Sequence, residues 1–202
     1  MAGAKRVAYR LKAWICFADE CGKTLRAAKA TTWAPRGVTP VVKVTAAGNA
    51  RVSVAGMVCY RPGHRSRLIY RTMTYRGRKG EPKGFREADL ARLLDTARQQ
   101  LDGPIVLIWD RLGTHKSTQM QTLIADRPWL RVYYLPAYAP ELNPTEKVWS
   151  ALKRSLANLP VRTAATLTKA VKNRLKRMQY RHGLVDGYFT GTGLSPPSPN
   201  RP

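Results

Sequence analysis

The stretch Pro104-Ile-Val-Leu-Ile-Trp-Asp110 decides the fold that we expect for this chain. A continuous apolar run of this length is typical of a strand that is buried on both faces, and here it ends at an acid. Residues 13–18 form a second apolar run, which ends at Asp19 and Glu20. Leucines at helical spacing fill residues 85–103, directly before the quoted stretch. A helix that leads into a buried strand predicts a right-handed crossover, which places that strand parallel to a neighbour.

The rest of the chain predicts more strands and helices of the same kind. Arg61-Pro-Gly-His64 separates two β-rich runs and predicts the turn of a hairpin. Residues 33–40 are a predicted turn in which Trp33 is interpreted as core, and residues 41–45 are β-prone. The order of elements predicts an α/β protein with a ribonuclease-H-like fold, in which helices flank a five-stranded mixed sheet. The remaining expected elements are strands at 51–60, 66–75 and 130–135 and helices at about 114–126, 144–156 and 163–180.

The composition describes one globular domain with a strong excess of positive charge. The chain has 202 residues, of which 44% are hydrophobic, so a single core is expected. Lysine and arginine number 36 against 12 aspartate and glutamate, which gives a net charge of +24. A surface that repels itself in this way is tolerable mainly when a polyanion neutralises it, so nucleic acid is the first partner to consider.

Cysteine usage and hydropathy exclude several other classes of protein. The cysteines at positions 16, 21 and 59 are odd in number and none are spaced as Cys-x-x-Cys, so neither a disulfide framework nor a zinc site is predicted. No stretch approaches the roughly 18 uncharged apolar residues of a membrane helix, and no apolar signal-peptide region follows the basic N-terminus. The sequence therefore predicts a cytoplasmic, nucleoid-associated protein with no membrane partner.

Two acids follow the two buried strands, and a third begins a later helix. Because parallel neighbouring strands open on the same edge of a sheet, Asp19 and Asp110 are expected to face each other. Carboxylates this close raise each other's pKa unless a cation lies between them, so the pair indicates a site for Mg²⁺ or Mn²⁺. Glu146 is the candidate third ligand. With two ions roughly 3.5–4 Å apart, such a site activates a water or a 3′-hydroxyl for attack on a phosphodiester.

Structural roles compete with these functional interpretations. Asp19 and Asp110 are also what a polar strand end or turn would carry. Asn143-Pro-Thr-Glu146 predicts a helix start in which Glu146 forms a capping box with Asn143 instead of facing a metal ion. His115 either contacts substrate or orients an acid, or it is a polar residue near a helix start. The basic helix expected at 163–180 is either a solvated face or a surface that tracks phosphates.

Four blocks of the sequence resemble the signatures of a known family. They resemble DDE transposases of the bacterial insertion sequence 630 family, which is related to the mariner transposases. The resemblance covers about residues 14–156, and its last block is the most specific because it is long and unusual. The 35 residues between Asp110 and Glu146 are similar to the spacing in that superfamily. The blocks are Phe17-Ala-Asp-Glu20, Trp33-Ala-Pro-Arg-Gly-Val-Thr-Pro40, Trp109-Asp-Arg-Leu-Gly-Thr-His-Lys-Ser117 and Tyr134-Leu-Pro-Ala-Tyr-Ala-Pro-Glu-Leu-Asn-Pro-Thr-Glu-Lys-Val-Trp149.

The resemblance implies a catalytic domain that cuts DNA at insertion-sequence ends and joins the freed 3′-hydroxyl to target DNA. It implies that Asp19, Asp110 and Glu146 are the catalytic residues and that they hold two Mg²⁺ ions, with Mn²⁺ as a substitute. The implied partner is double-stranded DNA, both transposon ends and target, and the family generally works as a dimer on DNA. The residues expected to contact the substrate are Arg111, His115, Lys116, Arg36, Lys172 and Lys176.

Two departures from the family's pattern leave other functions open. Family members often have Asn after the second Asp, where this chain has Arg111, and they carry N-terminal helix-turn-helix domains. We therefore expect residues 1–12 to be an N-terminal remnant, 13–188 the catalytic domain and 189–202 a disordered tail. The alternative function is a non-catalytic DNA-binding remnant of a transposase. Two other interpretations are the downstream half of a two-frame gene, joined to an upstream DNA-binding half, and a resolvase or ribonuclease on the same fold.

Overall fold

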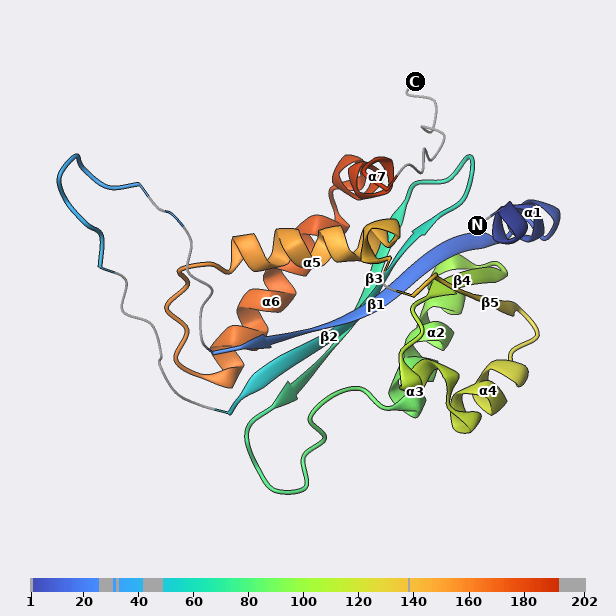
Figure 1. The fold of residues 1–202 in the computed structure, drawn as a ribbon, viewed down its shortest axis with the longest axis horizontal. Coiled ribbons are helices and arrows are strands. Elements are labelled where there is room, and N and C mark those ends of the chain that lie inside the picture. The colour runs from blue at the N-terminus through green and yellow to red at the C-terminus, as the bar shows by residue number, and fades with distance from the viewer. Residues whose placement is uncertain (1, 26–30, 32, 42–48, 138, 193–202) are drawn as a thin grey trace.

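The computed structural model describes residues 2–25, 31, 33–41, 49–137 and 139–192, and in these ranges helices surround one sheet (Figure 1). The strands are β1 (Trp14–Thr24), β2 (Arg51–Tyr60), β3 (Arg67–Tyr75), β4 (Ile105–Trp109) and β5 (Leu130–Tyr134). The helices are α1 (Ala2–Arg10), α2 (Glu87–Leu101), α3 (Gly113–Lys116), α4 (Thr118–Ala125), α5 (Pro144–Ser155), α6 (Ala164–Gln179) and α7 (His182–Thr190), with a short 3₁₀ helix η1 (Pro140–Leu142) before α5.

β1 lies in the middle of the sheet, whose strand order is β3-β2-β1-β4-β5. It is antiparallel to β2 and parallel to β4, and the parallel register ends where Phe17 lies opposite Ile108. All five residues of β4 are buried, because strands flank it on both sides and helices cover both faces of the sheet. The predicted α/β class, the five-stranded mixed sheet and the parallel pairing of the two apolar runs are confirmed.

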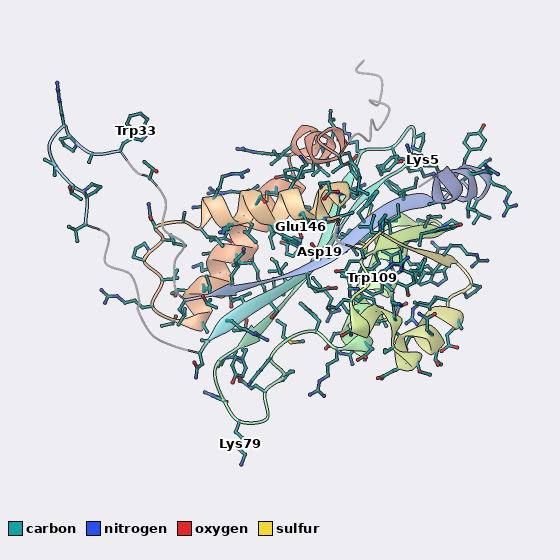
Figure 2. All side chains as sticks on the ribbon, viewed as in Figure 1. Lys5, Asp19, Trp33, Lys79, Trp109 and Glu146 are labelled. Atoms are coloured by element: carbon teal, nitrogen blue, oxygen red, sulfur yellow. The ribbon has the colours of Figure 1, made fainter. Side chains whose placement is uncertain are left out.

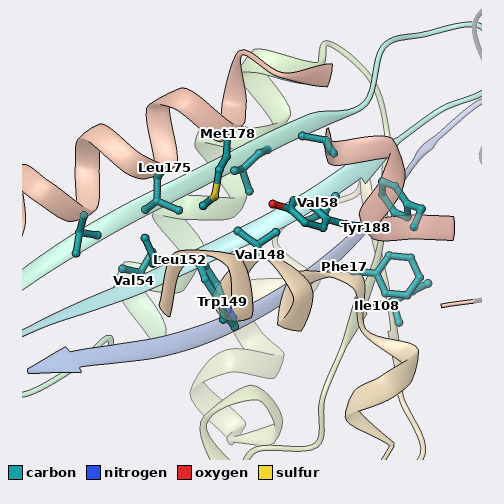
Figure 3. Close-up of a cluster of buried hydrophobic side chains, with 14 of the residues drawn as sticks. Phe17, Val54, Val58, Ile108, Val148, Trp149, Leu152, Leu175, Met178 and Tyr188 are labelled. Carbon is teal, nitrogen blue, oxygen red and sulfur yellow. The ribbon is translucent and has the colours of Figure 1, made fainter. Parts of the chain in front are cut away.

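The helices form a layer on each face of the sheet. α2 and α4 cover one face, and α5, α6 and α7 cover the other (Figure 1). The side chains of β1 alternate between the two layers, so Ile15 and Phe17 lie in the apolar cluster under α5–α7, while Cys16 and Ala18 lie in the cluster under α2. Figure 3 shows part of the first cluster, where α5 and α6 pack on the sheet. The same alternation decides which layer each of the following acids meets.

The first strand continues past Asp19 to Thr24, whereas the sequence predicted that it ends at Asp19. Its pairing with β4 stops at Phe17, but its pairing with β2 continues until Thr24 lies opposite Arg51. The antiparallel partner supplies backbone hydrogen bonds to residues that are too polar for a strand buried on both faces. Asp19 is therefore inside a strand, and the pleat fixes the direction of its side chain.

Most other predicted elements are confirmed within a few residues, but the helix expected at 114–126 is two helices, α3 and α4. Ser117 separates them, because its hydroxyl accepts a hydrogen bond from the Met120 N–H at 3.1 Å and so begins a new helix. The predicted hairpin joins β2 to β3, and Gly63 takes the positive φ of its turn.

Both ends of the chain hold a helix that the sequence analysis missed. The residues expected to be an N-terminal remnant form α1, with the side chain of Ala8 buried against the sheet. Near the other end, α7 follows the helix that was expected to be the last. Phe189, which was assigned to a disordered tail, is fully buried and packs edge-on against Tyr60 with ring centroids 4.9 Å apart. Val185 and Phe189 are spaced four residues apart, which turns both toward the core and stabilises α7.

The interpretation of Trp33 as a core residue is wrong, because its side chain is fully exposed. The 33–40 block has no helix or strand, as predicted. The β-prone run at 41–45 and the tail after residue 192 lie outside the described residues, apart from Val41. Across the described ranges, no helix combines the length and the apolar composition that crossing a bilayer requires.

Candidate active site

The pleat of β1 sends two neighbouring acids to opposite faces of the sheet. Asp19 follows Ile15 and Phe17 on the face that α5 covers, whereas Glu20 follows Ala18 on the face of α2 and α3. Asp110 comes directly after β4, the parallel neighbour of β1. Figure 2 shows that Asp19 of β1 and Glu146 of α5 lie close together near the middle of the molecule. The acids therefore converge where the pairing of β1 with β4 ends.

The start of α5 docks onto the β1 backbone at this point. The Thr145 hydroxyl donates to the Phe17 carbonyl at 2.6 Å, and the Asn143 side-chain amide donates to the Ala18 carbonyl at 3.2 Å. Asn143 also caps the helix, because its side-chain oxygen accepts from the Thr145 N–H at 3.1 Å. Because β1 loses its β4 partner after Phe17, residues of α5 take the place of the missing strand. This docking brings Glu146 to the side of Asp19.

The capping-box interpretation of Glu146 is wrong. The Asn143 N–H, which a capping box would direct to the Glu146 carboxylate, donates instead to the Pro140 carbonyl at 2.9 Å. The Glu146 side chain is exposed, and its negative charge is one of the causes of the raised pKa of Asp19. Its carboxylate is therefore available to a ligand at the edge of the sheet.

Asp19 is held in a buried position by two hydrogen bonds. Its side chain is 8% exposed, and it accepts from the Glu20 N–H at 2.9 Å and from the Trp149 indole N–H at 3.0 Å. Burial, together with the negative charges of Glu146, Glu20 and Asp110, raises the pKa of Asp19 to about 7. A cation next to this carboxylate would offset both causes.

Trp149 reaches Asp19 only because β2 has no side chain at Gly56. A Cβ at that position would lie 2.9 Å from the indole ring, closer than van der Waals contact allows, and in a tight contact of 3.3 Å with the Ile69 carbonyl. Gly56 lies opposite Asp19 in the β1–β2 register. A glycine on the neighbouring strand thus makes room for the ring that orients the carboxylate.

Asp110 is oriented by a buried histidine that also contacts Glu20. The His115 Nδ1 lies 2.6 Å from the Asp110 carboxylate, and its Nε2 lies 3.2 Å from the Glu20 carboxylate. The second contact is an ion pair and not a hydrogen bond. The His115 ring is fully buried and stacks on Trp109 with ring centroids 3.7 Å apart.

The contacts among His115, Asp110 and Glu20 decide the charge of each side chain. Burial lowers the pKa of His115, but the contacts with Asp110 and Glu20 outweigh burial and raise it to about 9. The hydrogen bond from His115 holds the pKa of Asp110 below its usual value. At neutral pH a buried imidazolium therefore bridges two carboxylates, one from each parallel strand.

The oxygen-rich donor set fits a divalent ion of the Mg²⁺ type. Within the described ranges, no group of three His, Cys, Asp or Glu side chains is arranged to hold a metal ion. Mg²⁺ is usually bound through one or two carboxylates and completes its shell with water and substrate phosphates, so a full protein cage is not required. The buried position of Asp19 beside the negative charges of Glu146 and Asp110 favours a cation at this place.

The structure places the other predicted substrate residues in three regions. Arg111 follows Asp110, and its Nε donates to the Leu135 carbonyl at 3.1 Å, while Lys116 is exposed on α3. Lys172 and Lys176 are exposed on α6, and Lys172 lines a groove of about 400 Å³ between α6 and the end of β3. Arg36 shares its segment with Trp33, which Figure 2 shows far from Asp19. Of these residues, only Arg111 and Lys116 therefore lie next to the acids.

The sequence analysis missed most of the residues that orient the acids. No contact with His115 was predicted for Glu20, although strand alternation already separates it from Asp19. Asn143 and Thr145 lie in the most specific motif, but only the capping role of Asn143 was predicted. No local signal points from Trp149 to Asp19. No feature of the sequence around Gly56 predicts its role, because that role depends on the Trp149 ring of α5.

The strand order β3-β2-β1-β4-β5, with helices on both faces of the sheet, is that of the ribonuclease-H-like class. Residues 14–168 match the family described as DDE superfamily endonuclease, and the chain belongs to that family. It is also 42% identical over 48 residues to the "Insertion element IS630 uncharacterized 39 kDa protein" of Shigella sonnei, a match that covers 24% of this chain and 14% of that protein. The family match confirms the DDE part of the resemblance, and the second match is a local similarity to an insertion-element protein.

Solved structures share the fold at low sequence identity. The Mos1 strand transfer complex aligns with a TM-score of 0.61 and 16% identity, covering 95% of this chain and 53% of that one. A Mos1 transposase catalytic domain with raltegravir and Mg aligns with a TM-score of 0.54 and 14% identity, covering 95% of this chain and 87% of that one. This chain thus spans about half the length of the longer Mos1 chain and most of the catalytic domain. The likeness confirms the ribonuclease-H-like fold.

Proposed function

We propose that this chain is a transposase catalytic domain that cleaves DNA strands and transfers them at insertion-sequence ends, in a reaction that requires Mg²⁺ or Mn²⁺. The observation that carries the proposal is the convergence of Asp19, Asp110 and Glu146 from three elements at one edge of the sheet. Membership of the DDE endonuclease family and the match to an insertion-element protein support it. Mos1 structures with Mg and with Mn on the same fold support the choice of metal.

In the proposed mechanism, Asp19, Asp110 and Glu146 would hold two divalent ions. The chemistry that such ions would supply there is activation of a water or 3′-hydroxyl and stabilisation of the leaving oxygen. The protein's own contribution is to fix the carboxylates before substrate arrives. Trp149 and the Glu20 N–H fix Asp19, and His115 fixes Asp110. Rigid ligands of this kind reduce the reorganisation that the reaction would otherwise require.

The proposed substrate is double-stranded DNA, held mainly through its phosphates. The net charge of +24 and the groove beside Lys172 offer many phosphate contacts. Arg111 and Lys116 lie next to the acids and are proposed to contact phosphates near the reacting bond. Because some Mos1 structures are paired-end complexes, we extend the proposal to a homodimer on DNA.

The test is strand nicking of supercoiled and short duplex DNA at low salt with Mn²⁺. The unaltered chain is expected to nick DNA, and Asp110→Asn is expected to lose nicking while it keeps DNA binding. Asp126→Asn is the matched control, because Asp126 is an exposed acid at the end of α4 and its substitution removes the same negative charge. Equal nicking by Asp110→Asn and the unaltered chain would refute the mechanism.

A second candidate function is a DNA-binding remnant without catalysis. It is favoured by the absence, among the described residues, of three side chains arranged to hold a metal, and by Arg111 beside Asp110. DNA binding with a steep salt dependence, but without cleavage in Mn²⁺ or Mg²⁺, would establish this function instead.

A further inference from the structure

A second cavity lies at the other end of the sheet from the acids. It has a volume of about 500 Å³ and lies between α1 and the hairpin that joins β2 to β3. Ile15 lines it, while Asp19 is four residues further along β1, which corresponds to about 13 Å at the rise of a strand. Phe17 lies between the two and is fully buried. The cavity is therefore separate from the candidate active site.

The cavity combines an aromatic and apolar lining with a positively charged rim. Tyr60 and Ile15 are buried at its floor, whereas the ring of Tyr9 is 87% exposed on α1. Lys5, Lys12 and Arg61 supply three cations, and the cavity lining includes no acid among the described residues. Such a lining attracts an anion that also carries a flat, apolar part.

The α1 side of this cavity precedes the region that defines the family. The family match begins at residue 14, whereas Lys5, Tyr9 and Lys12 come before it. An aromatic side chain as exposed as Tyr9 has no role in the core, and its neighbours on α1 are basic. The endonuclease assignment therefore does not account for this surface.

We propose that the cavity binds an unpaired nucleotide of a DNA strand. The base would stack on Tyr9, and the adjoining phosphates would lie against Lys5, Lys12 and Arg61. The volume lies within the range of pockets that bury small ligands, and base stacking tolerates any sequence because every base has a flat face. A base within a duplex already stacks on both sides, so the unpaired form fits the cavity. An acidic peptide would satisfy the cations but would leave the aromatic lining without a partner.

The experiment measures binding, so it does not depend on catalysis. A fluorescent oligothymidylate is titrated without metal into the Asp110→Asn variant, and salt dependence is recorded. Tyr9→Ala is expected to weaken binding about tenfold, whereas Tyr9→Phe, which keeps the ring, retains it. Tyr180→Ala is the matched control, because Tyr180 is also exposed but lies at the end of α6.

The charge variants test the phosphate contacts. Lys5→Gln is expected to reduce the slope of log K against log salt concentration by about 0.7. Lys79→Gln is the control, because Figure 2 places Lys79 on the opposite side of the molecule from Lys5. An unchanged affinity in Tyr9→Ala, combined with a loss in Lys5→Gln, would mean that the surface is an unspecific basic patch and would overturn the proposal.

Photo-crosslinking locates the bound base directly. An oligonucleotide with 5-iodouracil is expected to crosslink to Tyr9, which is the only aromatic residue of the tryptic peptide 7–10. Crosslinks confined to other peptides, or Tyr9-dependent binding of polyglutamate as tight as that of the oligonucleotide, would overturn the proposal. Competition with thymidine monophosphate distinguishes binding of a free nucleotide from binding of a strand. The monophosphate is expected to compete more weakly than the oligonucleotide, because only a strand gains the additional phosphate contacts. If the unaltered chain nicks DNA but neither the Tyr9 effect nor the crosslink is found, only this inference is overturned. If both are found but the unaltered chain does not nick DNA, only the proposed function is overturned.

Discussion

Trp149→Phe tests whether the indole N–H is what orients Asp19. The substitution removes the donor that lies 3.0 Å from the carboxylate and keeps an aromatic ring in the space beside Gly56. In the metal-free protein the pKa of Asp19 is raised from 3.8 to about 7. The folded state therefore keeps a proton that the unfolded chain releases, so stability falls as the pH rises from about 4 to about 7.

The expected size of the effect depends on pH. A hydrogen bond to a charged group contributes about 1.5–3 kcal/mol, which corresponds to about 1–2 pKa units. Without the donor, the pKa of Asp19 rises further, and the range in which stability falls extends to higher pH. The loss of stability in Trp149→Phe is thus expected to be about 1.5 kcal/mol larger at about pH 8.5 than at about pH 6. The packing loss from the smaller ring is the same at both values and cancels.

The assay is urea unfolding of both proteins without metal at the two pH values. Trp14→Phe is the control, because the Trp14 ring is also buried but its indole N–H donates to the uncharged Leu101 carbonyl at 2.9 Å. Its effect on stability is expected to lack this rise with pH. A Trp149→Phe loss that is equal at both pH values, or the same rise in Trp14→Phe, would refute the reasoning.

Three further predictions follow from the same site. Gly56→Ala places a Cβ 2.9 Å from the Trp149 ring and is expected to lower the free energy of unfolding by about 1–3 kcal/mol in urea titrations. Thr145→Val removes the donor to a buried β1 carbonyl, and a loss of about 1–3 kcal/mol is expected by calorimetry. Mn²⁺ at about 100 times its Kd is expected to stabilise the protein by about 2.7 kcal/mol in thermal unfolding, and Asp110→Asn is expected to abolish most of this gain.

Each of these predictions has a matched control. Gly22→Ala adds the same methyl group in β1, where nothing lies within 4 Å, so it should cost far less than Gly56→Ala. Thr145→Ser keeps the hydroxyl and should keep most of the stability. Asp126→Asn should retain the full gain from Mn²⁺. If a control matched its test variant, the contact assigned to that residue would be wrong.

The sequence predicts best those helices, strands and turns whose limits depend on their own residues. β4 is a continuous apolar run, and such a run is stable only where both faces are covered, so its limits follow from composition. The hairpin between β2 and β3 follows from Pro62 and Gly63, because those residues restrict the backbone to a turn. β1 was predicted too short, since the partner that extends it to Thr24 lies about 30 residues away in sequence.

The sequence by itself predicted the central place of β1 beside β4, singled out Asp19, Asp110 and Glu146 as candidate metal ligands and carried the motifs of the family to which the chain belongs. Residue types, spacing and motifs carry that information, because they depend only on neighbours along the chain. Only the tertiary structure decided that His115 lies between Asp110 and Glu20 and that Asp19 accepts the indole N–H. These contacts join residues up to 130 positions apart, and both burial and Coulomb interactions depend on distances that exist only after the sheet and its helices have packed.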